Sequence, residues 1–253
     1  MFNIAQTLNG LFNQKYEMIK QKVYLTFIFT IILTLASAQK SVNQFDKNGK
    51  RHGLWTKNYY QTDQKRYEGQ FVHGKEVDTF KYYTLSNGKS VLSATKVFRL
   101  KDSLSDVKFY TSKGYVISEG QMNGKLYIGQ WVFYHKNSST TMIKEHYNEE
   151  GQLEGERLVY YKNGTVAETA HYKNGKLEGE SKWYSETKTL LRHSVYKNDE
   201  LNGKTTYYNS EGKKTSEGTY VADRKSGIWK YYKEGKLSRE IDHTNNKVIK
   251  KYD

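Results

Sequence analysis

A short block of sequence returns along this chain at a nearly fixed period, and this feature constrains the fold more than any other. The block Tyr-Lys-Asn-Gly-Lys-Leu-Glu-Gly ends at Gly179 and returns as Tyr-Lys-Asn-Asp-Glu-Leu-Asn-Gly, which ends at Gly203. The closing glycine, here called the anchor, recurs at spacings of 26, 24, 24 and 24 residues, at Gly129, Gly155, Gly179, Gly203 and Gly227. Each anchor is followed by an aromatic residue, at Tyr134, Tyr161, Tyr184, Tyr208 and Tyr232. A period in this range predicts a repeat array.

The same frame extends upstream, where Gly53 fits it and Asp78 and Ser105 replace the anchor glycine. This extension gives eight repeats. We therefore predict an N-terminal extension and signal peptide at residues 1–38, a linker at 39–48 and the repeat array at 49–253. Because the array fills the chain after residue 49, we expect no separate catalytic domain and no enzyme activity.

Each repeat contains two strand-like segments rich in Tyr, Thr, Val and Trp, such as residues 179–184 and 190–196. The chain has no proline, and Asn-Gly pairs such as Asn163-Gly164 supply the positive φ that tight hairpin turns need. The sequence thus predicts an all-β fold, an elongated single-layer antiparallel β-meander of about eight hairpin repeats. With two strands per repeat, equivalent residues should lie roughly 10 Å apart and the array should extend about 75 Å.

Successive strand residues point to opposite faces of a sheet, so the alternation predicts two surfaces. The apolar face is expected to carry Phe80/Tyr82, Val107/Phe109, Trp131/Phe133, Leu158/Tyr160, Ser181/Trp183, Thr205/Tyr207 and Trp229/Tyr231. The opposite surface, here called the Lys/Tyr face, is expected to carry Lys81/Tyr83, Lys108/Tyr110, Val132/Tyr134, Val159/Tyr161, Lys182/Tyr184, Thr206/Tyr208 and Lys230/Tyr232.

The first residues of the chain have the pattern of an export signal. Lys20 and Lys22 make residues 18–22 positively charged, residues 23–36 form an apolar run, and Ala36-Ser37-Ala38 is a small-x-small cleavage site. The run is shorter than the roughly 18 to 20 residues that span a bilayer. We expect an N-terminal signal-peptide helix, cleavage after Ala38 and a periplasmic or extracellular protein, or a membrane anchor through residues 23–38 if the signal stays attached. Translation starts at Met1 or Met18.

The mature chain is basic and lacks cysteine. Residues 39–253 hold 38 basic and 26 acidic residues, a formal charge of +12, which favours anionic partners. The absence of cysteine excludes disulfides and a lipid-anchoring cysteine. Export argues against nucleic acid as the partner.

The order and spacing of these motifs resemble those of a known repeat family. Gly-x-Trp-x-Tyr-Tyr at Gly227, Glu-Gly-x-Tyr at residues 217–220 and the block that ends at Gly179 are similar to the MORN repeat, and more closely to its bacterial variant, including YwqK-like antitoxins. The similarity covers about residues 49–245. The resemblance implies a scaffold, a membrane-proximal binder or a partner-binding module. The sequence departs from the family pattern at Asp78, Ser105 and Asn198-Asp199.

The sequence holds no clear pattern of a metal-binding or catalytic site. His146 and His171 hold the same repeat position, but two strands should separate them by roughly 10 Å, too far for one zinc ion. A regular row of glutamates, expected to pair with lysines across strands, offers no single tuned acid; its members are Glu68, Glu119, Glu145, Glu168, Glu217 and Glu240. No nucleophile elbow, Walker or dinucleotide-binding motif is present. We therefore expect no catalytic residue, no metal site and no cofactor.

Two functional hypotheses remain. The first is an exported, non-enzymatic scaffold that binds a protein, antitoxin-like by resemblance. The alternative is a binder of an anionic envelope polymer or glycan, or of a membrane surface, through the Lys/Tyr face. Stacking on the tyrosines and charge contacts with the lysines would serve such a ligand. The candidate binding residues are Lys81, Tyr83, Lys108, Tyr110, Tyr134, Tyr161, Lys182, Tyr184, Tyr208, Lys230 and Tyr232.

Overall fold

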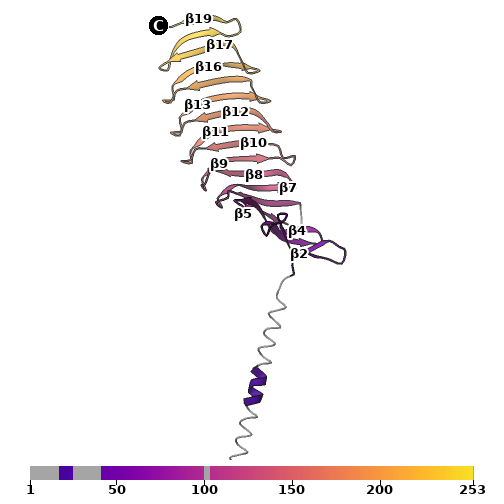
Figure 1. Cartoon of the computed structure of the whole chain (residues 1–253). Helices are drawn as coiled ribbons and strands as arrows, with labels where there is room; N and C mark the ends of the chain where they lie inside the picture. Colours follow the sequence, from indigo (N-terminus) through magenta and orange to yellow (C-terminus); the bar gives the residue numbers. More distant parts are fainter. Residues whose placement is uncertain (1–16, 25–40, 100–102, 253) are drawn as a thin grey trace, which may run out of the picture.

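The protein is a single open antiparallel sheet, seen as a long ladder of strands in Figure 1. The computed structural model describes residues 17–24, 41–99 and 103–252. Residues 17–24 are helical, and no helix within the described residues is long and apolar enough to cross a membrane. The predicted cleavage site at Ala36-Ser37-Ala38 lies outside the described residues. The all-β meander predicted from the period is confirmed.

The strands follow one another along the ladder in chain order. The first half comprises β1 (Gln44–Phe45), β2 (Arg51–Asn58), β3 (Lys65–Val72), β4 (Lys75–Ser86), β5 (Lys89–Phe98), β6 (Leu104–Tyr110), β7 (Val116–Asn123), β8 (Leu126–Tyr134) and β9 (Thr141–Tyr147). The second half comprises β10 (Gly155–Tyr160), β11 (Val166–Lys173), β12 (Lys176–Tyr184), β13 (Leu190–Lys197), β14 (Glu200–Leu201), β15 (Gly203–Tyr208), β16 (Lys214–Val221), β17 (Arg224–Lys233), β18 (Lys236–Asp242) and β19 (Lys247–Lys251).

Each strand pairs antiparallel with the next, except that β13 pairs with both the short β14 and β15. The eight predicted repeats correspond to the hairpins β2/β3, β4/β5, β6/β7, β8/β9, β10/β11, β12/β13, β15/β16 and β17/β18. Residues 44–45, which lie in the predicted linker 39–48, form β1 and pair with His52 and Arg51.

The anchor position is conformationally special in most repeats. All five strong anchor glycines have positive φ, for example 61° at Gly129 and 63° at Gly227. Asp78 keeps this left-handed conformation with φ 58°, although it carries a side chain. Ser105 instead sits in regular pairing opposite Met122. Of the two degenerate anchors, therefore, one preserves the backbone geometry and the other loses it.

Rings lie over the apolar face and bury it without a second layer. Trp131 and Trp229 have no exposed surface, and Phe80 and Val107 are 1% exposed. Trp131 stacks on Tyr127 with ring centroids 3.7 Å apart, and its Nε1 donates to the carbonyl of Gln121 at 2.9 Å. Gly120 lies directly beneath this indole, where a Cβ would come within 2.5 Å of the ring. Gly69 lies beneath Phe80 and Gly218 beneath Trp229 in the same way.

The middle of the apolar face is built differently, from small side chains. Ala170 lies opposite Ser181, and Ser181 opposite Ser194. Ser181, Ser194 and Thr205 are fully buried, and their hydroxyls have no hydrogen-bond partner. Strand β12 therefore carries a serine where β8 and β17 carry a tryptophan.

The fifth repeat corrects the predicted face assignment by one residue. Tyr160 ends β10 opposite Val166, as Tyr134 ends β8 opposite Thr141, so Tyr160 and not Tyr161 continues the tyrosine ladder. Leu158 pairs with Lys144, which is itself opposite Val132, and so lies on the Lys/Tyr face. The prediction was wrong here because the two extra residues of the 26-residue spacing come before Gly155, in the turns at residues 135–140 and 148–152, so the ladder tyrosine is again the fifth residue after the anchor.

Candidate functional site

The strand register gathers the predicted lysines into one row across the sheet. Lys81 lies opposite Glu68 on one side and Thr95 on the other, and Thr95 lies opposite Lys108. In the later repeats the row continues as Lys182, His193, Thr206, Glu217 and Lys230, each opposite the next. The Lys/Tyr face therefore exists as a continuous surface in which lysines are interspersed with glutamates and with neutral residues.

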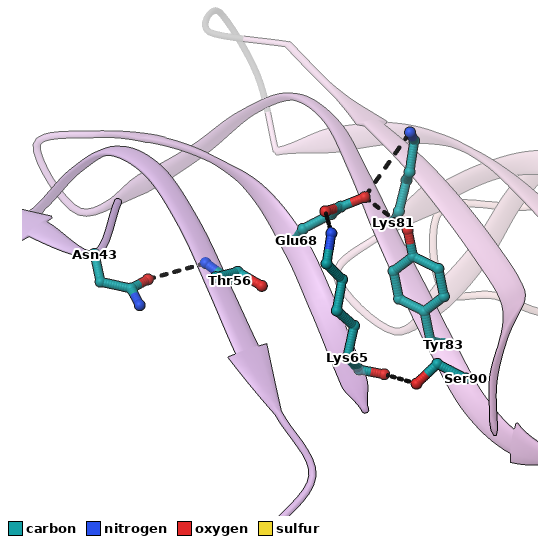
Figure 2. A network of polar contacts seen from close by, with 7 residues as sticks. All are labelled: Asn43, Thr56, Lys65, Glu68, Lys81, Tyr83 and Ser90. Atoms are coloured by element: carbon teal, nitrogen blue, oxygen red, sulfur yellow. Dashed lines mark hydrogen bonds and ion pairs between the residues drawn. The ribbon is translucent and has the colours of Figure 1, made fainter. Parts of the chain in front are cut away.

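Glu68 is the centre of the first polar cluster on this face (Figure 2). Its carboxylate accepts a hydrogen bond from Lys65 Nζ at 2.6 Å and one from Tyr83 Oη at 2.6 Å, with Lys81 Nζ at 3.9 Å. The Lys65 ammonium, followed by the Tyr83 hydroxyl, lowers the pKa of Glu68. Burial and this hydrogen bond raise the pKa of Tyr83 to about 12.

The same arrangement returns at Glu119 and at Glu217. Glu119 accepts from Tyr134 Oη and pairs with Lys108 Nζ at 2.7 Å. Glu217 accepts from Tyr232 Oη at 2.6 Å and pairs with Lys214 at 3.1 Å and Lys204 at 3.4 Å. The Tyr232 hydrogen bond is the largest cause that lowers the pKa of Glu217 to about 2.

Other predicted site residues are also held within the sheet. Tyr161 Oη donates to the carbonyl of Tyr184 at 2.7 Å, and Tyr110 Oη lies 3.2 Å from the Thr95 hydroxyl. Lys182 pairs with Glu180 at 2.8 Å. Tyr184 lines a shallow open hollow, and Tyr208 lies opposite Lys214 at the end of β15. Lys230 lies opposite Glu217 and Glu240.

Two of the predicted ladder glutamates lie on the apolar face instead. Glu145 is opposite Trp131, and Glu168 is opposite Trp183. Arg157 bridges both carboxylates, with Nε 3.2 Å from Glu145 and Nη1 3.2 Å from Glu168. The expected pairing with lysines is thus confirmed at Glu68, Glu119 and Glu217, and is wrong at Glu145 and Glu168, where an arginine takes that role.

An exposed tryptophan with an arginine over its ring was missed in the sequence. Trp183 is 42% exposed, and the Arg192 guanidinium lies 4.9 Å from its ring centroid. Tyr207 is opposite Arg192 on the next strand of the face. Ser181 was the signal in the sequence for the exposure of Trp183. A small residue two positions after the anchor leaves no large ring to pack beside Trp183 and cover it.

The two histidines that share a repeat position, His146 and His171, lie on different strands that are not adjacent. His146 lies on β9 opposite Gln130, and His171 lies on β11 opposite Glu156, with β10 between their strands. Among the residues that the structure describes, one group of histidines and carboxylates has its ligand atoms close together, Asp46, His52 and His73. Nothing in the period pointed to this group.

The two middle repeats match a known family. Residues 153–174 and 177–198 match the family model described as MORN repeat variant. No curated protein matches the chain. Among solved structures, the chain is similar to a mutant of S. aureus TarM in complex with Fondaparinux, alpha-GlcNAc-glycerol and UDP, with 11% identity and a TM-score of 0.18, over 54% of this chain and 21% of that one. The chain thus spans about a fifth of the length of that structure.

Proposed function

Because the chain carries two MORN repeat variant units within a longer sheet of similar hairpins, we propose that it is an exported, non-enzymatic repeat protein that binds another protein. The exposed ring of Trp183, with the half-buried Arg192 beside it, carries this proposal. It lies on β12 and β13, inside the second matched repeat. An antitoxin-like role, which the resemblance implies, would be one case of such binding.

Side-chain type is the reason for choosing a protein as the partner. Trp, Tyr and Arg are the residues that most often dominate the energy of protein interfaces. All three types adjoin here, since Arg192 is opposite both Trp183 and Tyr207. The guanidinium over the indole holds the ring in place, which reduces the side-chain entropy lost on binding.

The lysine row supports an anionic polymer less well. Lys81, Lys108 and Lys182 each lie within 4.0 Å of a glutamate oxygen, so their charges are partly neutralised inside the sheet. The tyrosine hydroxyls of Tyr83, Tyr134 and Tyr232 are bound to glutamates as well. Polymer binding remains the second hypothesis because the chain carries a formal charge of +14.

Two variants separate the hypotheses. Trp183→Ala removes the exposed ring, and the combined change of Lys81, Lys108, Lys182 and Lys230 to Gln removes the lysine charges. Each variant and the wild type would be crosslinked in an envelope fraction, and the captured proteins identified by mass spectrometry. In parallel, binding to poly-glutamate would be measured across a salt series.

A protein partner should be captured by the wild type and by the four-lysine variant but lost from Trp183→Ala. A partner retained by Trp183→Ala would contradict the proposal. Poly-glutamate binding that disappears in the four-lysine variant and at high salt would favour the polymer instead. Export has its own test, since N-terminal sequencing of the secreted chain should begin at Gln39, and a chain that retains residues 1–38 would contradict cleavage.

A further inference from the structure

Three residues from separate segments meet at the first repeat. Asp46 follows β1, His52 lies in β2, and His73 lies in the turn between β3 and β4. His73 Nδ1 is 2.7 Å from Asp46 Oδ2, and the rings of His52 and His73 are 5.0 Å apart. One ligand atom from each residue lies within 4.8 Å of the other two.

The turn chemistry of the array does not require these side chains. In each hairpin turn of this type, the amide of the second turn residue donates to the carbonyl two positions before the anchor. Gly74 donates to Arg51 in this way, Gly175 to Leu153, and Asp199 to Leu177. His73 is therefore equivalent to Asn174 and Asn198, which have the same positive φ of about 50°. Asparagine tolerates this conformation well.

The other two positions can be compared with the fifth and sixth repeats. His52 precedes the anchor Gly53, where those repeats have Glu154 and Glu178, and these glutamates accept from the turn amides of Asn174 and Asn198. Asp46 organises its turn by accepting from the Lys50 amide at 3.0 Å, as Asn148 does from Gln152. The fifth repeat thus folds the same turns with Asn148, Glu154 and Asn174.

We propose that Asp46, His52 and His73 form a binding site for a divalent transition-metal ion of the zinc class. Two imidazoles and one carboxylate are donors that zinc binds at about 2.0 to 2.2 Å. Four ligands placed tetrahedrally at that distance lie about 3.3 Å apart, so closure needs shifts of roughly 1.5 Å at most. His73 can supply such a shift, because its side chain is 66% exposed.

The surroundings of Asp46 resemble the support that metal ligands usually have. Its side chain is only 7% exposed, and Oδ1 accepts from the amides of Asn48 and Lys50. These hydrogen bonds fix the carboxylate and direct Oδ2 toward His73. Outer hydrogen bonds of this kind orient ligands and raise their affinity. The fourth position of the metal is left to water or to a group from a partner.

The test is a zinc titration of the full chain by calorimetry, with variants taken from the fifth repeat. Asp46→Asn and His73→Asn keep the turn-forming groups that Asn148 and Asn174 supply, so the fold should survive both changes. We expect one zinc ion per wild-type chain and affinity at least about tenfold lower in each variant. The double variant His146→Gln/His171→Gln is the matched control and should bind as the wild type does.

A melting series provides a second readout. Zinc that binds the folded site should raise the melting temperature of the wild type and not that of His73→Asn. The proposal is overturned if the wild type takes up no zinc. It is also overturned if His73→Asn binds zinc like the wild type, or if the control loses binding.

Discussion

The indole of Trp131 rests on the backbone of Gly120, with no room for a side chain between them. A Cβ at Gly120 would lie 2.5 Å from the ring, although Gly120 itself does not have the positive φ of the anchor glycines. The requirement for glycine here is therefore one of space. Where the fifth and sixth repeats adjoin, Ala170 and the small side chain of Ser181 occupy the positions of Gly120 and Trp131, so no ring has to fit over the backbone.

Gly120→Ala should destabilise the protein by about 1 to 3 kcal/mol, because the added methyl group forces the indole off its site. Trp131→Ser should cost about 3 to 5 kcal/mol through lost burial. The double variant reproduces the Ala170 and Ser181 pair, so its cost should be less than the sum of the two single changes. Urea unfolding of the four proteins measures this coupling, and strictly additive costs would contradict the steric account.

Arg157→Ala should destabilise the middle of the array by about 3 to 5 kcal/mol, because it leaves two carboxylates without their cation. The side chains concerned are 22% exposed at Arg157, 9% at Glu145 and 14% at Glu168. Adding Glu145→Gln and Glu168→Gln to Arg157→Ala should recover much of the loss. Thermal unfolding of the single and triple variants checks this, and equal stability of the two would count against a paired role.

Stability should depend on Glu217 in a defined range of acid pH. The folded protein holds the pKa of Glu217 at about 2, below its usual 4.5, with the Tyr232 hydrogen bond as the largest cause. A lowered carboxyl pKa contributes stability above pH 4.5 that is lost as the pH falls toward about 2. The stability difference between wild type and Glu217→Gln should shrink over this range. Tyr232→Phe should weaken the pH dependence, and an unchanged profile would contradict the assignment.

Removing residues 179–202 should leave a folded protein, because the deletion joins Glu178 to the equivalent anchor Gly203. Each repeat contacts mainly its neighbours, so the strand signal in circular dichroism should fall in proportion to length. Deleting residues 179–203 is the control, since it removes the anchor and moves the rest of β15 to the wrong face. Loss of folding in the first variant would indicate a cooperative closed domain.

The periodic part of the fold could be predicted from the sequence because turns and alternation are local. The period placed the hairpins, and the alternation placed Phe80, Trp131 and Trp229 at buried positions. The fifth repeat was phased wrongly, although its sequence held the signal. Tyr160 and Tyr161 are adjacent, but only Tyr160 is five residues after its anchor, as Tyr134 and Tyr184 are, and the strand pairing confirms that Tyr160 ends β10.

Side-chain clusters between segments that are far apart in the sequence could not be predicted in this way. Arg157 stands two residues after an anchor, where the pattern favours a ring, and its partners Glu145 and Glu168 lie on strands to either side of it. Asp46 and His73 are 27 residues apart and meet only because two turns lie at one end of the same hairpins. Their contact depends on the pairing register of the strands, and a sequence pattern does not define that register to within one residue.

The register shifts that end the first strand of nearly every hairpin also affect how a partner can approach. They fall at pairs such as Phe133/Tyr134 and Tyr231/Tyr232. Bulges add to the turn of roughly 20 to 25° between neighbouring strands, and the strands at the indigo end of the sheet in Figure 1 are seen at a different angle from those at the yellow end. A stripe of one residue per repeat therefore winds around the long axis. A straight, rigid partner can follow a few consecutive repeats, and a partner that follows them all has to wind with the sheet.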